Sequence, residues 1–174
     1  MALRKLYIFV EGNDDEIFFK GVIFPIIREK YDDLELIKYA QLKREKVDLF
    51  LLSIQTLKFN YVFTADKDEY NTLNGKRNII LDKYDFVEES DIIIVVTEIE
   101  SWFLAGLSDE AMESFGIEPV ESTEEITKEE FNTLYHRKFR SRIDFMYEIM
   151  KIYSIDCALE KNRSFNYFWD KFCK

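Results

Sequence analysis

The chain has 174 residues, of which 47% are hydrophobic and 16% aromatic, so it can bury a sizeable core and lacks the composition of a disordered protein. Its formal net charge of -10 at pH 7 counts against a free-standing nucleic-acid binder, because such proteins are usually basic. A single histidine, His136, and two cysteines without a CxxC spacing argue against a zinc site and a histidine-based catalytic triad.

Buried strands and helices alternate over most of the chain. The apolar run at 6–10 predicts a strand, and the residues after it change to helical spacing. Asn13 followed by Glu16 predicts a capping box at the start of that helix, and Pro25 predicts a kink or an end within it. The expected elements up to residue 97 are strands at 6–10, 34–40, 61–65 and 91–97, helices at 13–31 and 45–59, and a helix or irregular segment at 75–90.

The remainder of the chain is predicted to be helical. The amphipathic pattern at 142–153 and the aromatic-rich pattern at 164–173 each predict a helix. Residues 98–116 predict one helix or two short ones, and residues 117–130 predict a loop followed by a helix start.

This order of elements predicts an α/β fold. Strands that are apolar throughout and alternate with helices are typical of a mainly parallel, Rossmann-like sheet with helices on both faces. We expect a single domain over 1–174, with an α/β core at 1–105 and a helical C-terminal part at 106–174.

Acidic residues follow three of the predicted strands. Glu11 follows the first, Asp66 and Asp68 follow the third, and Glu98 and Glu100 follow the fourth. Since the carboxyl ends of parallel strands meet at one edge of a sheet, these like charges converge, and a divalent cation would remove their repulsion. Oxygen ligands favour Mg²⁺ or Mn²⁺ over zinc, and pairs of such ions promote phosphoryl displacement.

Several of these acids have two interpretations. Glu98 and Glu100 face the same way only if their segment is extended; if a helix has begun, one of them is a partner of the helix dipole. Asp66 and Asp68 also suit a polar turn, and Asp15 suits the first turn of a helix. Gly12 would let the turn after the first strand approach a phosphate closely or adopt positive φ.

The sequence Glu11-Gly12-x-x-Asp15 after a buried strand, with Asp66-x-Asp68 after a later one, resembles the TOPRIM domain of topoisomerases, bacterial primases and overcoming-lysogenization-defect nucleases. The segments at 97–105 and 162–172 also resemble a TOPRIM-like bacterial and archaeal family of unknown function, over nearly the whole chain. The resemblance implies that Glu11 binds metal or acts as general acid or base, and that Asp66 and Asp68 bind magnesium. It implies that Glu98 or Glu100 completes the site, with Asp15 as a less secure ligand.

The resemblance also implies an activity and partners. We expect a Mg²⁺- or Mn²⁺-dependent nuclease or other phosphodiester-processing enzyme, with two ions, DNA or RNA as substrate, and an ATPase partner in phage defence. Because the body of the chain is acidic, we expect such a partner to supply affinity for nucleic acid. A homo-oligomer is also compatible with the sequence.

A basic stretch near the end of the chain offers a further contact surface. Residues 128–174 contain 10 Lys and Arg against 7 Asp and Glu, whereas residues 1–127 contain 14 against 27. Basic side chains around an aromatic one can contact a nucleic-acid backbone, or they can form a solvated face that balances the acidic body. The residues concerned are Arg137, Lys138, Arg140 and Arg142, around Phe139.

Two other classes of function stay open. The first is a receiver-like phosphoacceptor domain, with Asp14 and Asp15 as the acid pair, Asp66 as acceptor and Thr97 as hydroxyl, although no fifth strand precedes a suitable lysine. The second is a catalytically inactive module that keeps the TOPRIM-like fold and binds a partner through its aromatic C-terminal helices. For all three classes we expect a cytoplasmic protein, since no apolar run approaches the length of a membrane span and the thiols suit a reducing compartment.

Overall fold

The computed structural model describes residues 3–135 and 138–174, and the chain forms two compact units. The N-terminal unit extends to Ile94, and the C-terminal unit begins at Val95. The division falls at the fourth strand, earlier than the boundary after residue 105 that the sequence suggested.

The N-terminal unit contains a four-stranded parallel sheet, which confirms the predicted α/β, Rossmann-like class. The sheet order is β2-β1-β3-β4, so β1 lies between β2 and β3 and pairs in parallel with both. Each predicted strand is present with small changes at its ends. The strands are β1 (Lys5–Val10), β2 (Asp33–Lys38), β3 (Asn60–Asp66) and β4 (Ile92–Val95).

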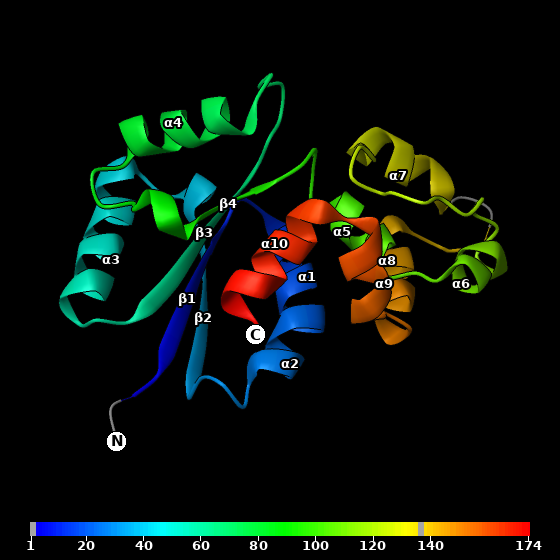
Figure 1. Ribbon diagram of the computed structural model, residues 1–174, viewed down its shortest axis with the longest axis horizontal. Helices are drawn as coiled ribbons and strands as arrows, with labels where there is room; N and C mark the ends of the chain where they lie inside the picture. The colour runs from blue at the N-terminus through cyan, green and yellow to red at the C-terminus, as the bar shows by residue number, and fades with distance from the viewer. Residues whose placement is uncertain (1–2, 136–137) are drawn as a thin grey trace. The chain divides into compact units, whose positions relative to one another are not determined.

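Helices flank both faces of this sheet. In Figure 1, α1 and α2 lie on one side of the strands, and α3 and α4 lie on the other. The predicted helix at 45–59 is confirmed, and the uncertain segment at 75–90 contains a helix followed by irregular chain. The helices are α1 (Asn13–Phe18), α2 (Phe24–Ile27), α3 (Arg44–Thr56) and α4 (Leu73–Lys83), with short 3₁₀ turns at Tyr39–Gln41 and Glu89–Asp91.

Alternation along the strands creates two buried faces. Phe9 and Phe63 lie in one core with Leu51 of α3 and Tyr84, which follows α4. Successive side chains on a strand point to opposite faces, so the neighbours of Phe9 belong to the other face, where Ile8 is also fully buried. The continuous apolar runs in the sequence therefore reflect strands that are covered on both sides.

The start of the first helix differs from the predicted capping box. The N-cap is Gly12 rather than Asn13, and its backbone N–H donates to the carboxylate of Asp15 at 3.1 Å. The carboxylate of Glu16 instead pairs with Lys20 at 2.5 Å and Lys38 at 2.8 Å, and these cations lower the pKa of Glu16. The prediction was wrong because Glu16 finds partners outside the cap.

The expected interruption at Pro25 is present. A π-helical segment, Phe19–Ile23, separates α1 from α2, and Pro25 lies in the first turn of α2. Proline has no backbone N–H to continue the ladder of hydrogen bonds, and the first turn of a helix is where this loss costs least.

The C-terminal unit is helical, as predicted. The region 98–116 forms two short helices, whereas the sequence had given no indication of α9. The unit contains α5 (Glu100–Ala105), α6 (Asp109–Ser114), α7 (Lys128–Leu134), α8 (Arg142–Lys151), α9 (Ile155–Lys161) and α10 (Arg163–Phe172).

Aromatic side chains form the centre of the C-terminal unit. Trp102 is fully buried, and its ring centroid lies 5.3 Å from those of Phe165 and Phe168 on α10. The indole N–H donates to the hydroxyl of Ser164 at 2.8 Å, so its one polar group is satisfied in the core. This packing joins α5 to α10.

The fourth strand is shorter than predicted. It ends at Val95, and Thr97 adopts φ of 67°, an uncommon conformation for a β-branched residue. The Thr97 hydroxyl donates to the backbone carbonyl of Glu124 at 3.0 Å, which helps to hold this turn. The turn ends the extended conformation that the apolar run at 91–97 would otherwise continue.

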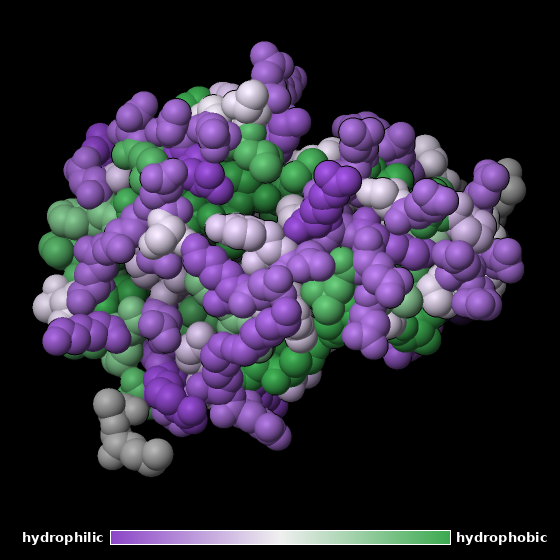
Figure 2. Space-filling view, in the orientation of Figure 1, coloured by the Kyte–Doolittle hydropathy of each residue, from purple (hydrophilic) through white to green (hydrophobic). Residues whose placement is uncertain are grey.

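The face shown in Figure 2 is mostly hydrophilic, with apolar side chains exposed between the polar ones. Several large apolar residues are at least 40% exposed, among them Leu49 and Leu57 in the N-terminal unit and Ile152 in the C-terminal unit. Within the described residues, no helix combines the length and the apolar character that crossing a membrane requires.

Candidate metal centre

The strand order of the sheet reverses between β1 and β3, beside Glu11 and Asp66. From β1 the chain proceeds to β2 on one side, and from β3 it proceeds to β4 on the other. In open parallel sheets, ligands bind in the crevice beyond the carboxyl ends of the two strands at this switch point. Glu11 follows β1 and Asp66 ends β3, so both are placed there by the topology.

Three carboxylates meet at this position. One carboxylate oxygen from each of Glu11, Asp66 and Asp68 lies within 4.8 Å of the other two. Among the described residues, these three form the one group of acidic, histidine or cysteine side chains with the proximity that a metal ion requires. The structure therefore brings together three of the five acids that the sequence predicted to converge.

Glu11 is held by two hydrogen bonds. Its Oε1 accepts from the hydroxyl of Tyr39 at 3.0 Å and from the backbone N–H of Asp66 at 3.3 Å. The Tyr39 hydroxyl also lies 3.0 Å from the backbone carbonyl of Thr64, and with one proton it donates to only one of these acceptors at a time. Burial, and then the charge of Glu11, raise the pKa of Tyr39 well above its usual value, so the hydroxyl keeps its proton.

Asp68 lies in a turn after β3. The N–H of Tyr70 donates to the carbonyl of Lys67 at 3.3 Å, which closes the turn around Asp68. Asp68 has φ of 53°, in the left-handed region that Asp tolerates better than most residues. This conformation belongs to the turn that carries its carboxylate to the cluster.

A lysine from α4 completes the cluster. The Nζ of Lys76 lies 2.5 Å from Oδ2 of Asp68 and 3.8 Å from Oε1 of Glu11, and its side chain is only 12% exposed. Burial alone would lower the pKa of Lys76, but the hydrogen bond to Asp68 and the charge of Glu11 outweigh burial and raise that pKa. The site therefore combines three acids with one ammonium group.

The donor set fits a hard divalent cation. All three groups offer carboxylate oxygens, which suit Mg²⁺ or Mn²⁺. Two oxygens on opposite sides of one Mg²⁺ are about 4.2 Å apart, given metal–oxygen distances of about 2.1 Å. The upper limit of 4.8 Å in the cluster exceeds this distance, so the three side chains would have to move closer together to bind one ion.

Gly12 and Asp15 contribute to the turn beside the cluster. Gly12 has φ of -145°, so the positive φ suggested from the sequence is not adopted. A Cβ at this position would meet only Oδ2 of Asp15, at 3.8 Å, so the fold itself tolerates a larger residue. Asp15 is 5% exposed, accepts the Gly12 N–H and lies in the first turn of α1, which is the position that the sequence offered as an alternative to metal binding.

Glu98 and Glu100 belong to the C-terminal unit, and the chain is helical from Glu100 onwards. Glu98 accepts a hydrogen bond at 2.6 Å from the backbone N–H of Lys128, the first residue of α7. Glu100 is 2% exposed and forms an ion pair with Arg142 of α8, and the Nζ of Lys128 lies 3.8 Å from it. Metal binding by these two acids stays a prediction, and within their own unit they link α5, α7 and α8.

The basic residues predicted to contact nucleic acid occupy different environments. Arg137 lies outside the described residues. The ammonium of Lys138 donates to the carbonyl of Ser114 at 2.5 Å, Arg142 pairs with Glu100, and Arg140 is exposed. The ring of Phe139 packs against other aromatic rings, with centroids 5.0 Å from Phe115 and 4.9 Å from Phe145.

Sequence reasoning missed Tyr39 and Lys76. Tyr39 follows β2 and resembles any core aromatic in the sequence, while Lys76 lies in a polar stretch that predicted a helix only loosely. The excess of acids expected at the sheet edge did indicate that hydrogen-bond donors or cations would lie nearby, because converging carboxylates repel one another. The sequence gave no means of choosing which lysine would supply the charge.

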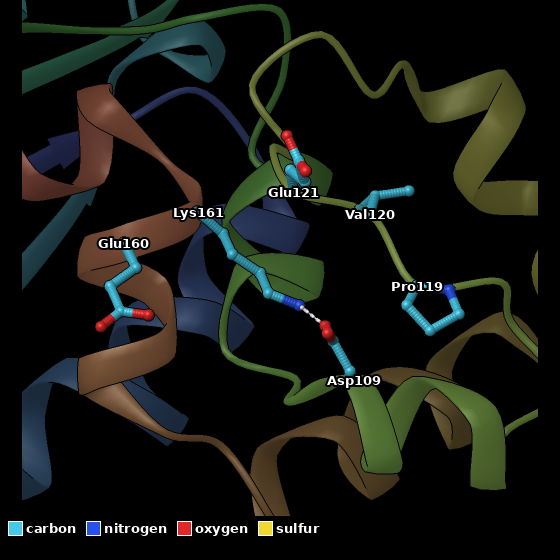
Figure 3. A pocket seen from close by; sticks show the side chains of 6 residues that line it. All are labelled: Asp109, Pro119, Val120, Glu121, Glu160 and Lys161. Atoms are coloured by element: carbon cyan, nitrogen blue, oxygen red, sulfur yellow. Dashed lines mark hydrogen bonds and ion pairs between the residues drawn. The ribbon is translucent and has the colours of Figure 1, made fainter.

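The C-terminal unit has an open hollow of about 280 Å³ (Figure 3). Its one lysine, Lys161, reaches across to Asp109 at 2.7 Å, and the dashed line in Figure 3 marks this ion pair. Its acids do not form a group with metal-binding proximity among the described residues. The lining residues are Asp109, Pro119, Val120, Glu121, Glu160 and Lys161.

Comparisons with protein-family models, with curated proteins and with solved structures find no match for this chain. The function of the cluster is therefore inferred from its geometry and chemistry together with the sequence motifs.

The hydrogen bond between Tyr39 and Glu11 is expected to contribute measurably to stability. Tyr39→Phe keeps the ring on Phe63, with centroids 4.3 Å apart, but removes the hydroxyl donor. We expect a loss of about 1.5–3 kcal/mol in the free energy of unfolding of the metal-free protein, the range for hydrogen bonds to charged groups. Urea unfolding of this variant, of Glu11→Gln and of the double variant measures the coupling energy. Tyr70→Phe is the control, and equal effects in both tyrosine variants would contradict this role.

The pair between Glu100 and Arg142 is expected to support the C-terminal unit. Arg142→Met removes a cation from beside a carboxylate that is 2% exposed, and breaking a buried pair costs about 3–5 kcal/mol. We expect the double variant with Glu100→Gln to recover part of the loss, because the neutral glutamine replaces the buried carboxylate that had lost its arginine. Thermal unfolding of the three variants checks this, and a double variant less stable than Arg142→Met would contradict it.

Proposed function

We propose that this protein is a Mg²⁺- or Mn²⁺-dependent enzyme that cleaves phosphodiester bonds in nucleic acid, with its centre at Glu11, Asp66 and Asp68. The observation that carries the proposal is the convergence of these three carboxylates at the switch point of a parallel sheet. The TOPRIM-like order of motifs in the sequence supports the same activity.

The chain's own residues have distinct roles in this proposal. Asp66 and Asp68 would hold the ion, and Glu11, with Oε1 fixed by Tyr39 and the Asp66 N–H, would bind it or move a proton. When bound, a divalent ion would neutralise charge on the phosphate and lower the pKa of a water molecule. The N–H of Asp66 and the hydroxyl of Tyr39 orient Glu11 without themselves carrying charge, so they leave the negative charge of the carboxylates in place for a cation.

The backbone at Gly12 supports the approach of a phosphate. Because a Cβ would fit there, the fold alone does not explain the glycine. A residue without a side chain beside Glu11 leaves the turn open to a large anionic ligand. The substrate is negatively charged and so is the protein, which supports a partner protein as the source of additional affinity.

The direct test is cleavage of labelled single- and double-stranded DNA and RNA with Mg²⁺ or Mn²⁺. We expect Glu11→Gln and Asp66→Asn to reduce the rate by roughly 100-fold or more, as is typical when a general base or a group that stabilises developing charge is lost. EDTA should abolish cleavage in the wild type.

A matched control distinguishes loss of the cluster from a general effect of removing one negative charge. Asp82→Asn changes an exposed acid on α4 of the same unit that is outside the cluster, and it should cleave at the wild-type rate. Equal rates in the wild type and all three variants would refute the proposed activity.

A further inference from the structure

Lys76 occupies the cluster as a cation would. Its ammonium lies 2.5 Å from Asp68 Oδ2 and 3.8 Å from Glu11 Oε1, and its side chain is 12% exposed. Both oxygens belong to side chains of the group that could hold a metal ion. A divalent ion bound to Asp68 and Glu11 would therefore meet a positive charge already in place.

The position of Lys76 is fixed by its helix. The side chain of Thr72 caps α4 by accepting from the Gly75 N–H at 3.0 Å, which sets where the first turn begins. Lys76 closes this turn, since its N–H donates to the carbonyl of Thr72 at 3.3 Å, and its Nζ also lies 5.3 Å from the centroid of the Tyr70 ring. The ammonium is thus directed to the cluster by a capped helix and an aromatic face rather than extended into solvent.

The charges of the cluster explain why a lysine is useful there. Three carboxylates within 4.8 Å repel one another, and one ammonium offsets part of that repulsion when no metal ion is bound. The same ammonium repels an incoming divalent ion, and binding must move it or overcome its field.

We propose that Lys76 is an internal counter-ion that competes with the divalent cation at the Glu11, Asp66 and Asp68 centre and sets the concentration at which the ion binds. This inference rests on the metal centre of the proposed function and adds a regulatory element to it. In the metal-bound form, the ammonium leaves Asp68 and becomes available to an anionic ligand at the same sheet edge.

The test is isothermal titration calorimetry of the metal-free protein with Mn²⁺. Lys76→Met removes the charge but keeps an unbranched apolar side chain, and we expect it to bind Mn²⁺ roughly tenfold more tightly than the wild type. Lys83→Met is the matched control, because Lys83 is an exposed lysine on the same helix whose Nζ lies over the Tyr84 ring. Lys76→Arg retains the charge and should bind no more tightly than the wild type.

Thermal unfolding provides a second measurement. Without metal, Lys76→Met should melt below the wild type, and saturating Mn²⁺ should raise its melting temperature by more than it raises that of the wild type. Lys76→Gln is a second neutral variant with the same expected affinity, so the comparison stands if the methionine variant does not fold.

The outcomes separate this inference from the proposed function. If the wild type binds Mn²⁺ and the neutral Lys76 variants bind no more tightly than Lys83→Met, the counter-ion role is overturned and the metal centre stands. If neither the wild type nor the neutral variants bind Mn²⁺, the metal centre itself is overturned.

Discussion

The mutual repulsion of three carboxylates at one edge of a sheet is the constraint on which the arrangement of the N-terminal unit depends. The parallel order β2-β1-β3-β4 directs the ends of β1 and β3 to the same crevice, and both ends carry acids. Two kinds of neighbouring group stabilise these carboxylates. The Tyr39 hydroxyl and the Asp66 N–H are neutral donors that orient Glu11, and the ammonium of Lys76 offsets part of the charge. A fold that needed only a polar turn at this edge would not require such support.

Glu98 and Glu100 have different contacts from the acids of the cluster. In the C-terminal unit, Glu98 receives the first N–H of α7, and Glu100 forms a buried pair with Arg142. These contacts join elements of one unit, as the contacts of Trp102 with α10 do in its core. In the acidic cluster of the N-terminal unit, by contrast, three carboxylates lie close to one another, and two of them contact the ammonium of Lys76. Proximity of like charges, rather than the number of acids, distinguishes a candidate centre from a structural network.

The sequence predicted much of the fold because the strands that build it are apolar throughout. The runs around Phe9 and Phe63 predicted strands covered on both faces, and the rule for the ends of parallel strands placed Glu11 and Asp66 together. What it missed depends on contacts between distant residues. Three such contacts join separate elements. They are the ion pair of Lys38 with Glu16, the hydrogen bond of Tyr39 with Glu11, and the ion pair of Lys76 with Asp68. Local patterns also failed at α9, whose short sequence has no clear apolar periodicity.

The central claim is that the cluster of Glu11, Asp66 and Asp68 is a cation site in the folded protein. Anomalous diffraction from crystals soaked in Mn²⁺ tests it most directly, because the signal locates the ion without assumptions about activity. The account predicts a peak about 2 Å from carboxylate oxygens of these residues, with the ammonium of Lys76 withdrawn from Asp68. Crystals that show manganese only at other positions, or an unchanged contact between Lys76 and Asp68 with no peak beside it, would contradict the account.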